Sequence, residues 1–455
     1  MVNCFKAYDL RGKYPSEINE TMAKRIGWAF ANVLNCNKVV VGYDIRSSSS
    51  ALMDALCEGL VESGVTVLDI GLCGTEEVYF ATSYENADGG IMITASHNPA
   101  DYNGMKMVGP ESRAMTRETG LDAIQAFVEE KKEAVLRRGG SRQEYSCRNQ
   151  YIEHLLSYID VNDLSPLRVV VNPGNGGAGL VLDHLKQSLP FEFVNINYEP
   201  DGSFPNGVPN PLLPENRCST SCAVEDSKAD FGIAWDGDFD RCFLFDENGD
   251  FVEGYYIVGL LASMLLKKHP GGRIVHDPRL IWNTIELVEK CGGVPLQSRT
   301  GHSLIKQSMR ENDAVYGGEM SAHHYFREFF YCDSGMIPWL LVAALVSSSG
   351  QPLSEHVAKS VSRYPSSGEI NILVSDVASV LSTVRDRFRS DALSVEYVDG
   401  VSLCFADWRF NLRASNTESL LRLNVESRGS AGLVKEKVAE LLDIIHKYNQ
   451  DELVC

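Results

Sequence analysis

The feature that most constrains the fold is a pattern that recurs three times along the chain. Each copy begins with a run of β-branched residues, continues through a polar loop and a stretch of helical apolar period, and ends in a second extended run. The copies span residues 38–71, 167–197 and 272–301. A strand, a crossover helix and a second strand form a βαβ unit, and such units build largely parallel sheets. The sequence therefore predicts three related α/β domains.

The C-terminal part of the chain has a different pattern. Residues 401–429 alternate between apolar and polar side chains, as in hairpin strands, and residues 432–449 form an amphipathic helical pattern. We expect a smaller α+β domain there. A length of 455 residues suits about three or four domains. The predicted domains are 1–145, 146–250, 251–362 and 363–455.

Composition excludes several classes of function. The net charge of −19 argues against sequence-independent binding to nucleic acids, which requires a basic surface. The N-terminus lacks the apolar stretch of a signal peptide, and the apolar run at 336–346 is shorter than the ~18 residues of a membrane span. The 12 cysteines are scattered without zinc-ligand spacing, which suggests a reducing compartment. We expect a cytoplasmic protein without nucleic-acid or membrane partners.

The segment "DGDFDR" places three acidic residues, Asp236, Asp238 and Asp240, directly after an apolar strand. Carboxylates this close repel one another unless a cation lies between them, and oxygen ligands suit Mg²⁺. Arg241 follows and is able to contact an anion near the metal. An EF-hand is excluded because it requires glycine where Arg241 stands. A solvated acidic turn remains the alternative.

The segment "TASHNPADYNGMK" (94–106) raises the question of what Ser96 does. The absence of a G-x-S-x-G pattern excludes the nucleophile elbow of a hydrolase. Ser96 is then either a cap of a helix or turn, or a carrier of a phosphoryl group. A carrier requires a metal, basic residues and a second phosphate site. The acidic segment, Lys106, Arg241 and the segment "RASNTES" (413–419) supply these.

Other segments favour a sugar-phosphate ligand, each with a structural alternative. In "GEMSAHHYF" (318–326), Glu319 and Ser321 are suited to hydrogen-bond sugar hydroxyls. In "RASNTES", Arg413 offers a guanidinium fork for phosphate, beside polar donors. His302 before a helix and Arg11 in a turn have ordinary structural roles as their alternatives.

One motif points elsewhere. "GNGGAG" (174–179) fits the G-x-G-x-x-G fingerprint of dinucleotide-binding proteins, and Glu199 lies 20 residues after Gly179, where that fingerprint has an acidic residue. A tight glycine turn is the alternative. A nucleotide-dependent dehydrogenase is therefore a rival function.

The four segments at 94–106, 236–241, 318–326 and 413–419, in this order, resemble the four motif loops of the α-D-phosphohexomutases. Over nearly its full length the chain is similar to the bacterial phosphomannomutase branch of that family, including "FKAYDLRGKYP" at the start and "NPLLPENR" at 210–217. The resemblance implies three related α/β domains and a smaller α+β domain around a central cleft.

The resemblance also implies roles for single residues. Ser96 carries the phosphate, and Mg²⁺ is held by a phosphoserine oxygen of Ser96 with Asp236, Asp238 and Asp240. The catalytic residues are Ser96, Lys106, Arg241 and His302. The substrate-binding residues are Tyr8, Arg11, Arg279, Glu319, Ser321, His323, Arg413, Ser415, Asn416 and Thr417. Ala322 stands where many relatives have glycine, and Arg279 where some have lysine.

The activity implied is the reversible interconversion of mannose 6-phosphate and mannose 1-phosphate. It proceeds through a phosphoserine enzyme and a hexose 1,6-bisphosphate, which is also the activator, and serves GDP-mannose synthesis. Candidates for the general base are Lys106, His302 and His323. We expect a monomer or weak dimer. The other possibilities are a dual glucose/mannose mutase, a phosphoglucosamine mutase and a non-catalytic sugar-phosphate sensor.

Overall fold

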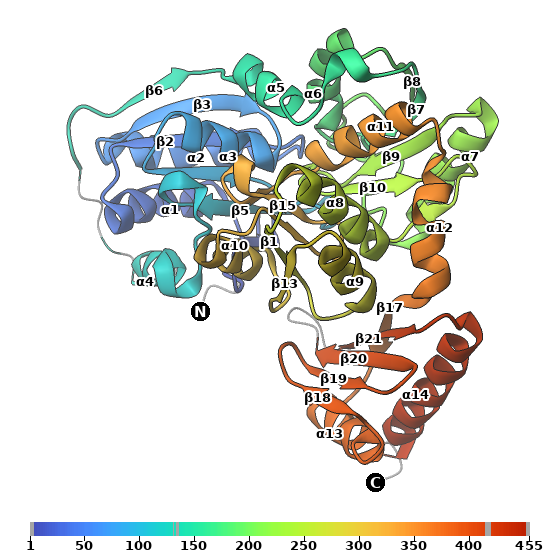
Figure 1. Ribbon diagram of the computed structural model, residues 1–455. Helices are drawn as coiled ribbons and strands as arrows, with labels where there is room; N and C mark the ends of the chain where they lie inside the picture. The colour runs from blue at the N-terminus through green and yellow to red at the C-terminus, as the bar shows by residue number, and fades with distance from the viewer. Residues whose placement is uncertain (1–3, 131, 133–135, 415–419, 452–455) are drawn as a thin grey trace. The chain divides into compact units, whose positions relative to one another are not determined.

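A computed structural model of the chain describes residues 4–130, 132, 136–414 and 420–451 (Figure 1). The chain divides into two compact units, one of residues 1–252 and 322–353, the other of residues 253–321 and 354–455. The third domain predicted from the sequence therefore contributes to both units. None of the described helices combines the length and apolar character needed to cross a membrane.

The first unit contains a six-stranded mixed sheet with the strand order β1-β5-β4-β2-β3-β6. The strands β4, β2, β3 and β6 are parallel to one another, whereas at one edge β5 pairs antiparallel with both β4 and β1. The bounds are β1 (Leu10–Lys13), β2 (Lys38–Tyr43), β3 (Thr66–Leu72), β4 (Gly89–Ile93), β5 (Tyr102–Val108) and β6 (Ser141–Glu144). Its helices are α1 (Glu20–Leu34), α2 (Ser49–Glu62), α3 (Thr75–Tyr84) and α4 (Asp122–Glu129). The βαβ unit predicted at 38–71 is confirmed as β2, α2 and β3.

A second mixed sheet in this unit has the order β11-β10-β9-β7-β8. Its strands are β7 (Arg168–Asn172), β8 (Glu192–Asn195), β9 (Phe231–Trp235), β10 (Cys242–Phe245) and β11 (Phe251–Val252). The strands β9, β7 and β8 are parallel, and β10 pairs antiparallel with both β9 and β11. The helices are α5 (Arg148–Leu156), α6 (Ala178–Leu185) and α7 (Cys218–Ser227). Since β10 and β11 form a hairpin directly after Asp240, the rejection of an EF-hand is confirmed.

The first unit is completed by residues 322–353. They form the antiparallel hairpin of β15 (His324–Phe326) and β16 (Cys332–Asp333), followed by α11 (Ile337–Ser349). Most of α11 is buried, including Trp339 and Leu340, as expected for the apolar run at 336–346. The hairpin carries His323 at its start and Asp333 in its second strand, so it positions two titratable side chains.

The second unit contains a parallel group of strands, β12 (Arg273–His276), β13 (Val294–Gln297) and β14 (Tyr316–Gly318). The helices here are α8 (Gly254–Lys268), α9 (Trp282–Lys290) and α10 (His302–Asn312), and α12 (Leu353–Arg363) follows later in the chain. The strand–helix–strand pattern predicted at 272–301 is confirmed as β12, α9 and β13.

The rest of the second unit is a fully antiparallel sheet with the order β17-β21-β20-β19-β18. Its strands are β17 (Ser366–Leu373), β18 (Ser394–Glu396), β19 (Val401–Cys404), β20 (Trp408–Ala414) and β21 (Leu420–Ser427). The helices α13 (Val377–Phe388) and α14 (Ala431–Asp451) pack on it (Figure 1). This confirms the hairpin strands and the amphipathic helix predicted for the C-terminal part.

A buried ion pair joins this sheet to the β12–α9 connection of the same unit. The Arg409 guanidinium donates to Glu426 at 3.0 Å, and both side chains are almost completely buried. Arg409 also donates to the carbonyl oxygens of Pro278 and Arg279, while Glu426 accepts from the backbone N–H of Ile281. These bonds fix the backbone of Arg279 beside the antiparallel sheet.

Candidate active site

Ser96 lies in the loop between β4 and β5, and its backbone conformation is strained. The residue is 3% exposed and has a φ of +51°, in the left-handed region where a residue other than glycine pays about 1–3 kcal/mol. Its backbone N–H donates to the Thr94 hydroxyl at 2.8 Å. Such strain persists only where the surroundings impose it, and it is common at functional sites.

Arg46 imposes the shape of this loop. Its buried guanidinium donates to the carbonyl oxygens of Ser96 at 2.8 Å and Asn98 at 2.6 Å, and also to those of Pro99 and Tyr102. Asp44 lies 3.4 Å from the same guanidinium. Sequence reasoning missed Arg46, although its place in the polar loop of the first βαβ unit is where functional side chains gather in α/β sheets.

The three acidic residues of the second sheet lie beside Ser96. Asp236, Asp238 and Asp240 follow the buried strand β9 and are each at most 2% exposed. One oxygen from each lies within 4.8 Å of the others. We call these three residues the aspartate cluster. The Ser96 hydroxyl donates to Asp236 at 2.9 Å, so the serine and the cluster form one site.

A glycine allows this approach of the two loops. A Cβ atom at Gly237 would lie 2.6 Å from the Ser96 carbonyl oxygen, which is too close for any side chain. The GNGGAG turn packs on the same loop, because the N–H of Gly177 donates to the Gly237 carbonyl oxygen at 3.5 Å. The N–H groups of Asn175 and Gly176 also donate to protein carbonyl oxygens. These are the amides that would bind a pyrophosphate, so the turn is structural and the dinucleotide interpretation loses its support.

Two basic side chains partly neutralise the aspartate cluster. Lys106 donates to Asp238 at 2.6 Å and to Asp240, and Arg241 donates to Asp236 at 2.7 and 3.0 Å. Burial alone would lower the pKa of Lys106, but the charges of Asp238 and Asp240 outweigh it and raise this pKa above its usual value. Lys106 is therefore a fixed positive charge in this arrangement.

The carboxylates of the cluster do not titrate alike. Burial alone would raise the pKa of Asp238, but Lys106 and Arg11 outweigh it and hold this pKa well below its usual value. Burial, together with the negative charge of Asp238, raises the pKa of Asp240 instead. Lys106 and Arg241 thus leave the cluster short of positive charge, which a cation would supply.

Two buried oxygens of the cluster give an independent indication of a cation. Among the described residues, no donor hydrogen-bonds Oδ1 of Asp238 or Oδ1 of Asp240. A buried carboxylate oxygen without a donor is costly, whereas a hard cation such as Mg²⁺ binds oxygen atoms of this kind. The donor set therefore fits Mg²⁺, with Asp236, Asp238 and Asp240 as its protein ligands.

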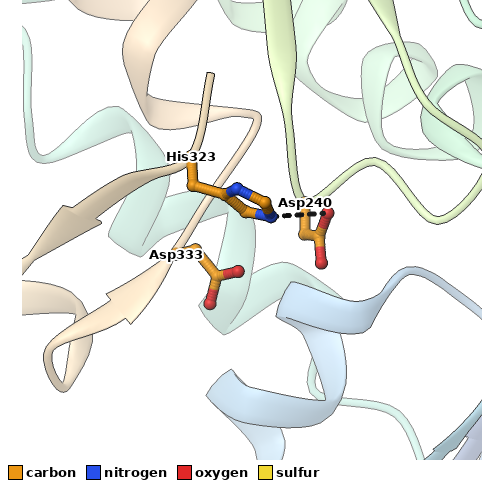
Figure 2. A group of neighbouring side chains, drawn as sticks. All are labelled: Asp240, His323 and Asp333. Atoms are coloured by element: carbon orange, nitrogen blue, oxygen red, sulfur yellow. Dashed lines mark ion pairs between the residues drawn. The ribbon is translucent and has the colours of Figure 1, made fainter. Parts of the chain in front are cut away.

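Figure 2 shows His323 and Asp333 from the β15–β16 hairpin next to Asp240. His323 Nε2 lies 4.0 Å from Asp240 Oδ1, and the three residues offer ligand atoms within 4.8 Å of one another. The structure thus brings His323 to the aspartate cluster. Ala322, just before it, has a φ of +69°, which explains why glycine is suited to this position.

The N-terminal residues predicted for the substrate lie in the same unit. The Arg11 side chain, in β1, donates to Asp9 at 2.8 Å and to the Asn98 side chain of the serine loop at 3.0 Å. A second arginine reaches the same serine loop, because Arg241 donates to Nδ1 of His97 at 2.5 Å. Tyr8 precedes β1 and is half-buried. Arg11 is therefore tied to the loop that carries Ser96.

The second unit brings together another set of predicted residues. Arg279 is 2% exposed, donates to Asp277 at 2.7 Å and to the Ser321 hydroxyl at 3.3 Å, and lies 3.8 Å from Glu319. Glu319 accepts from the backbone N–H of Gly301, at the start of the helix that His302 begins. Four predicted residues, Arg279, His302, Glu319 and Ser321, therefore meet in one place.

Arg413 joins them through a residue that the sequence did not single out. Glu369 in β17 accepts from Arg279 at 3.1 Å, from Arg413 at 3.3 Å and from Arg422 at 3.2 Å. We call Arg279, Arg413 and Arg422 the arginine cluster. Burial alone would raise the pKa of Glu369, but the three arginines outweigh it and lower this pKa. The predicted residues Ser415, Asn416 and Thr417 lie outside the described residues.

Comparison with known proteins identifies similar chains over the full length. Four family models of the phosphoglucomutase/phosphomannomutase family match: domain I at residues 2–135, domain II at 149–249, domain III at 253–364 and the C-terminal domain at 369–444. The first three are described as alpha/beta/alpha domains.

The curated relatives carry two kinds of name. A protein of Xanthomonas campestris pv. campestris named "Phosphohexose mutases" is 55% identical over 97% of this chain and 98% of its own length. A phosphomannomutase of Salmonella montevideo is 54% identical, and one of Escherichia coli (strain K12) is 51% identical, each over 98% of this chain and 99% of its own length. A crystal structure of a phosphoglucomutase/phosphomannomutase family protein from Burkholderia thailandensis matches with a TM-score of 0.85, at 30% identity and over 98% of both chains.

Proposed function

This chain belongs to the phosphoglucomutase/phosphomannomutase family and is an isomerase with phosphomannomutase activity, and on this premise we propose how its residues perform the reaction. The proposed reaction is the reversible interconversion of mannose 6-phosphate and mannose 1-phosphate. It passes through phosphoserine 96 and a hexose 1,6-bisphosphate. The observation that carries the proposal is the strained, buried Ser96, whose hydroxyl lies 2.9 Å from the aspartate cluster.

In the first half-reaction, the bond between Ser96 Oγ and phosphorus breaks. A bond forms between phosphorus and the free hydroxyl oxygen of the sugar phosphate, which gives the bisphosphate. The hydroxyl proton passes to a general base, and the leaving Ser96 Oγ takes up a proton to become the free hydroxyl. The bisphosphate then turns end for end, and its other phosphoryl group returns to Ser96. Product and substrate differ only in the position of phosphate, so the reaction is an isomerisation.

The charges around Ser96 are suited to this transfer. Asp236, Asp238 and Asp240, with an oxygen of phosphoserine 96, are proposed to hold Mg²⁺. When bound, Mg²⁺ supplies positive charge that neutralises the transferring phosphoryl group. Arg241 adds a second positive charge fixed by Asp236, and Lys106 a third fixed by Asp238 and Asp240. Positioning and charge neutralisation are the main sources of catalysis in phosphoryl transfer.

The general base is proposed to be one of three residues, Lys106, His302 or His323. Lys106 is held as a charged donor to two carboxylates, so it has to lose a proton before it can act as a base. His323 lies beside Asp240, whereas His302 begins α10 near Glu319. The pH profiles of the single variants Lys106→Met, His302→Gln and His323→Gln would distinguish them.

The second unit is proposed to bind the sugar and the phosphate that is not transferred. Glu319 and Ser321 are held beside Arg279, where they suit hydrogen bonds to neighbouring sugar hydroxyls. Arg413, with Ser415, Asn416 and Thr417, is proposed to bind the phosphate, and Tyr8, Arg11 and His323 to support substrate binding. Hexose 1,6-bisphosphate is proposed as the activator that phosphorylates Ser96, and the product to feed GDP-mannose synthesis.

The test is a comparison of kcat/KM for mannose 1-phosphate and glucose 1-phosphate, with Mg²⁺ and a trace of hexose 1,6-bisphosphate. We expect a clear preference for mannose 1-phosphate. Equal values would establish a dual mutase, which the relative named "Phosphohexose mutases" makes the second candidate function. No turnover with either sugar would contradict the proposal and direct the assay to glucosamine 1-phosphate.

A further inference from the structure

The two oxygens of Asp238 have different surroundings. Oδ2 accepts from Lys106 Nζ at 2.6 Å and from the Thr75 hydroxyl at 2.5 Å. Oδ1 is buried and has no hydrogen-bond donor among the described residues. Because both donors bind Oδ2, Oδ1 is the oxygen of Asp238 that is available to another ligand.

Thr75 is attached to the same loop by its backbone as well. It is the first residue of α3 and is completely buried. Its N–H donates to the carbonyl oxygen of Asp238 at 3.1 Å, while its hydroxyl donates to the carboxylate of that residue. The preceding Gly74 leaves no room for a side chain, because a Cβ there would lie 2.1 Å from the Phe239 ring. The N-terminus of α3 thus packs directly on the loop of the aspartate cluster.

Of the two donors on Oδ2, Thr75 is the more directional. The ammonium group of Lys106 rotates freely on a flexible stem, and it bonds to Asp240 as well as Asp238. Thr75 is β-branched and lies in a helix, so its hydroxyl has few orientations. The partial positive charge at a helix N-terminus further favours a carboxylate at this position. A carboxylate held by the lysine alone would be free to turn about its terminal torsion, which is broad in aspartate.

We propose that Thr75 is a positioning residue for the bound cation: its hydroxyl fixes the carboxylate of Asp238 so that Oδ1 faces the ion. The inference rests on the proposed function, because it takes Asp238 as a ligand of the cation. It adds a residue from a segment, 75–84, that lies outside the four motif loops.

The experiment measures binding of Mn²⁺, used as an EPR-visible substitute for Mg²⁺, to the full-length protein. Thr75→Val keeps the shape of the side chain and removes the hydroxyl, whereas Thr75→Ser keeps the hydroxyl and removes the methyl group. Loss of a group that orients a metal ligand typically weakens affinity about 10- to 100-fold. We expect Thr75→Val to raise the dissociation constant of Mn²⁺ about tenfold or more, and Thr75→Ser to stay within about threefold of wild type.

Two results would overturn the proposal. Wild-type Mn²⁺ affinity in Thr75→Val would show that the hydroxyl is not needed, and equal losses in the valine and serine variants would show that packing of the methyl group matters instead. If the valine variant does not fold, Thr75→Ala is compared with Thr75→Ser in its place, with the same criteria.

Asp238→Asn separates failure of this inference from failure of the proposed function. This variant should lose most Mn²⁺ binding if Asp238 is a ligand. Undiminished binding in Asp238→Asn would reject the assignment of the metal site itself, and the role of Thr75 with it. Loss in Asp238→Asn together with no loss in Thr75→Val would reject the role of Thr75 alone.

Discussion

The aspartate cluster and the arginine cluster contain similar numbers of opposite charges but leave different atoms without partners. In the aspartate cluster, Oδ1 of Asp238 and of Asp240 have no donor among the described residues. In the arginine cluster, no described acceptor bonds the Nε–H of Arg279, Arg413 or Arg422, although all three bond or pair with Glu369. One region has spare acceptors and the other spare donors.

The atoms without partners distinguish the two clusters more sharply than their net charges do. Spare carboxylate oxygens suit a hard cation, whereas spare guanidinium donors suit an anion such as phosphate. The two clusters therefore match two components of the proposed reaction, the metal and the phosphate that is not transferred.

The largest effect is expected at the serine beside the aspartate cluster. Ser96→Ala removes the proposed phosphoryl carrier, so turnover should fall by at least about 10³-fold, the loss typical of an essential catalytic group. Measurement of kcat, with circular dichroism as a check of folding, tests this. Ser83→Ala, a change to a serine in α3, is the control and should retain activity. Turnover of Ser96→Ala near the wild-type value would reject the phosphoserine mechanism.

Removing the lysine should make the aspartate cluster depend on the metal for stability. Lys106→Met removes the ammonium group that Asp238 and Asp240 share. Loss of one partner of a buried ion pair typically lowers the free energy of unfolding by about 3–5 kcal/mol. We expect a lower melting temperature in EDTA and a larger gain from Mg²⁺ than in wild type. Thermal unfolding of both proteins, with and without Mg²⁺, measures this. An equal response of the two proteins to Mg²⁺ would contradict the predicted dependence of the variant on the metal.

Arg413→Ala tests the arginine cluster. Loss of a hydrogen bond from a charged group to phosphate costs about 1.5–3 kcal/mol, which corresponds to a KM increase of roughly 10- to 100-fold. Since the phosphate proposed to bind here is not the one transferred, kcat should change less than KM. Steady-state kinetics with mannose 1-phosphate measures both constants. Arg387→Ala, a change at the end of α13, is the control, and an unchanged KM in Arg413→Ala would exclude this residue from the substrate site.

Glu76 is a buried acid whose pKa, unlike that of Asp238, is not lowered by any basic side chain of the described residues. It is completely buried in α3, and its carboxylate accepts from Tyr151 and from the N–H of Gly335 at 2.7 Å. Burial raises its pKa to about 8, against an ordinary value of 4.5, and these hydrogen bonds only partly oppose the rise. Asp238 shows the contrary shift because Lys106 and Arg11 face it.

The sign of the effect on stability follows from this shift. Between pH 4.5 and about 8 the folded protein keeps the Glu76 proton while the unfolded chain releases it. The contribution of Glu76 to the free energy of unfolding is therefore greatest below pH 4.5, decreases as the pH rises, and becomes constant above about pH 8. Glu76→Gln is neutral throughout, so its free energy of unfolding relative to wild type should be higher at pH 8.5 than at pH 5.5. Urea unfolding at the two pH values measures this, and an equal difference at both would contradict the shifted pKa.

Much of the site follows from local sequence patterns. The βαβ units, the aspartate cluster and the serine loop were predictable because each is a short segment, and its residue types and hydrophobic period are visible without knowledge of the rest of the fold. Residues with roles across the fold were not. Thr75 bonds to Asp238 over 163 positions, and Arg46 bonds to Ser96 over 50. No local pattern marks such pairs, because tertiary packing alone brings them together.

The GNGGAG turn shows the opposite error. Its spacing matches a nucleotide-binding fingerprint, but its N–H groups donate to carbonyl oxygens of Pro173, Asn197 and Gly237. The fingerprint specifies the positions of the glycines in the sequence, but it does not specify which acceptors the backbone N–H groups bind. Glu369 was missed for a related reason, since a single glutamate in a strand gives no sign that three arginines surround it.

The most direct test of the account is to locate the phosphoryl group on the protein. The enzyme is incubated with hexose 1,6-bisphosphate and Mg²⁺, digested, and mapped by mass spectrometry under conditions that preserve both phosphoserine and phosphohistidine. We predict phosphate on Ser96 that disappears when mannose 1-phosphate is added in excess and the bisphosphate appears. Phosphate on the neighbouring His97, or no transferable phosphate on the protein, would contradict the account.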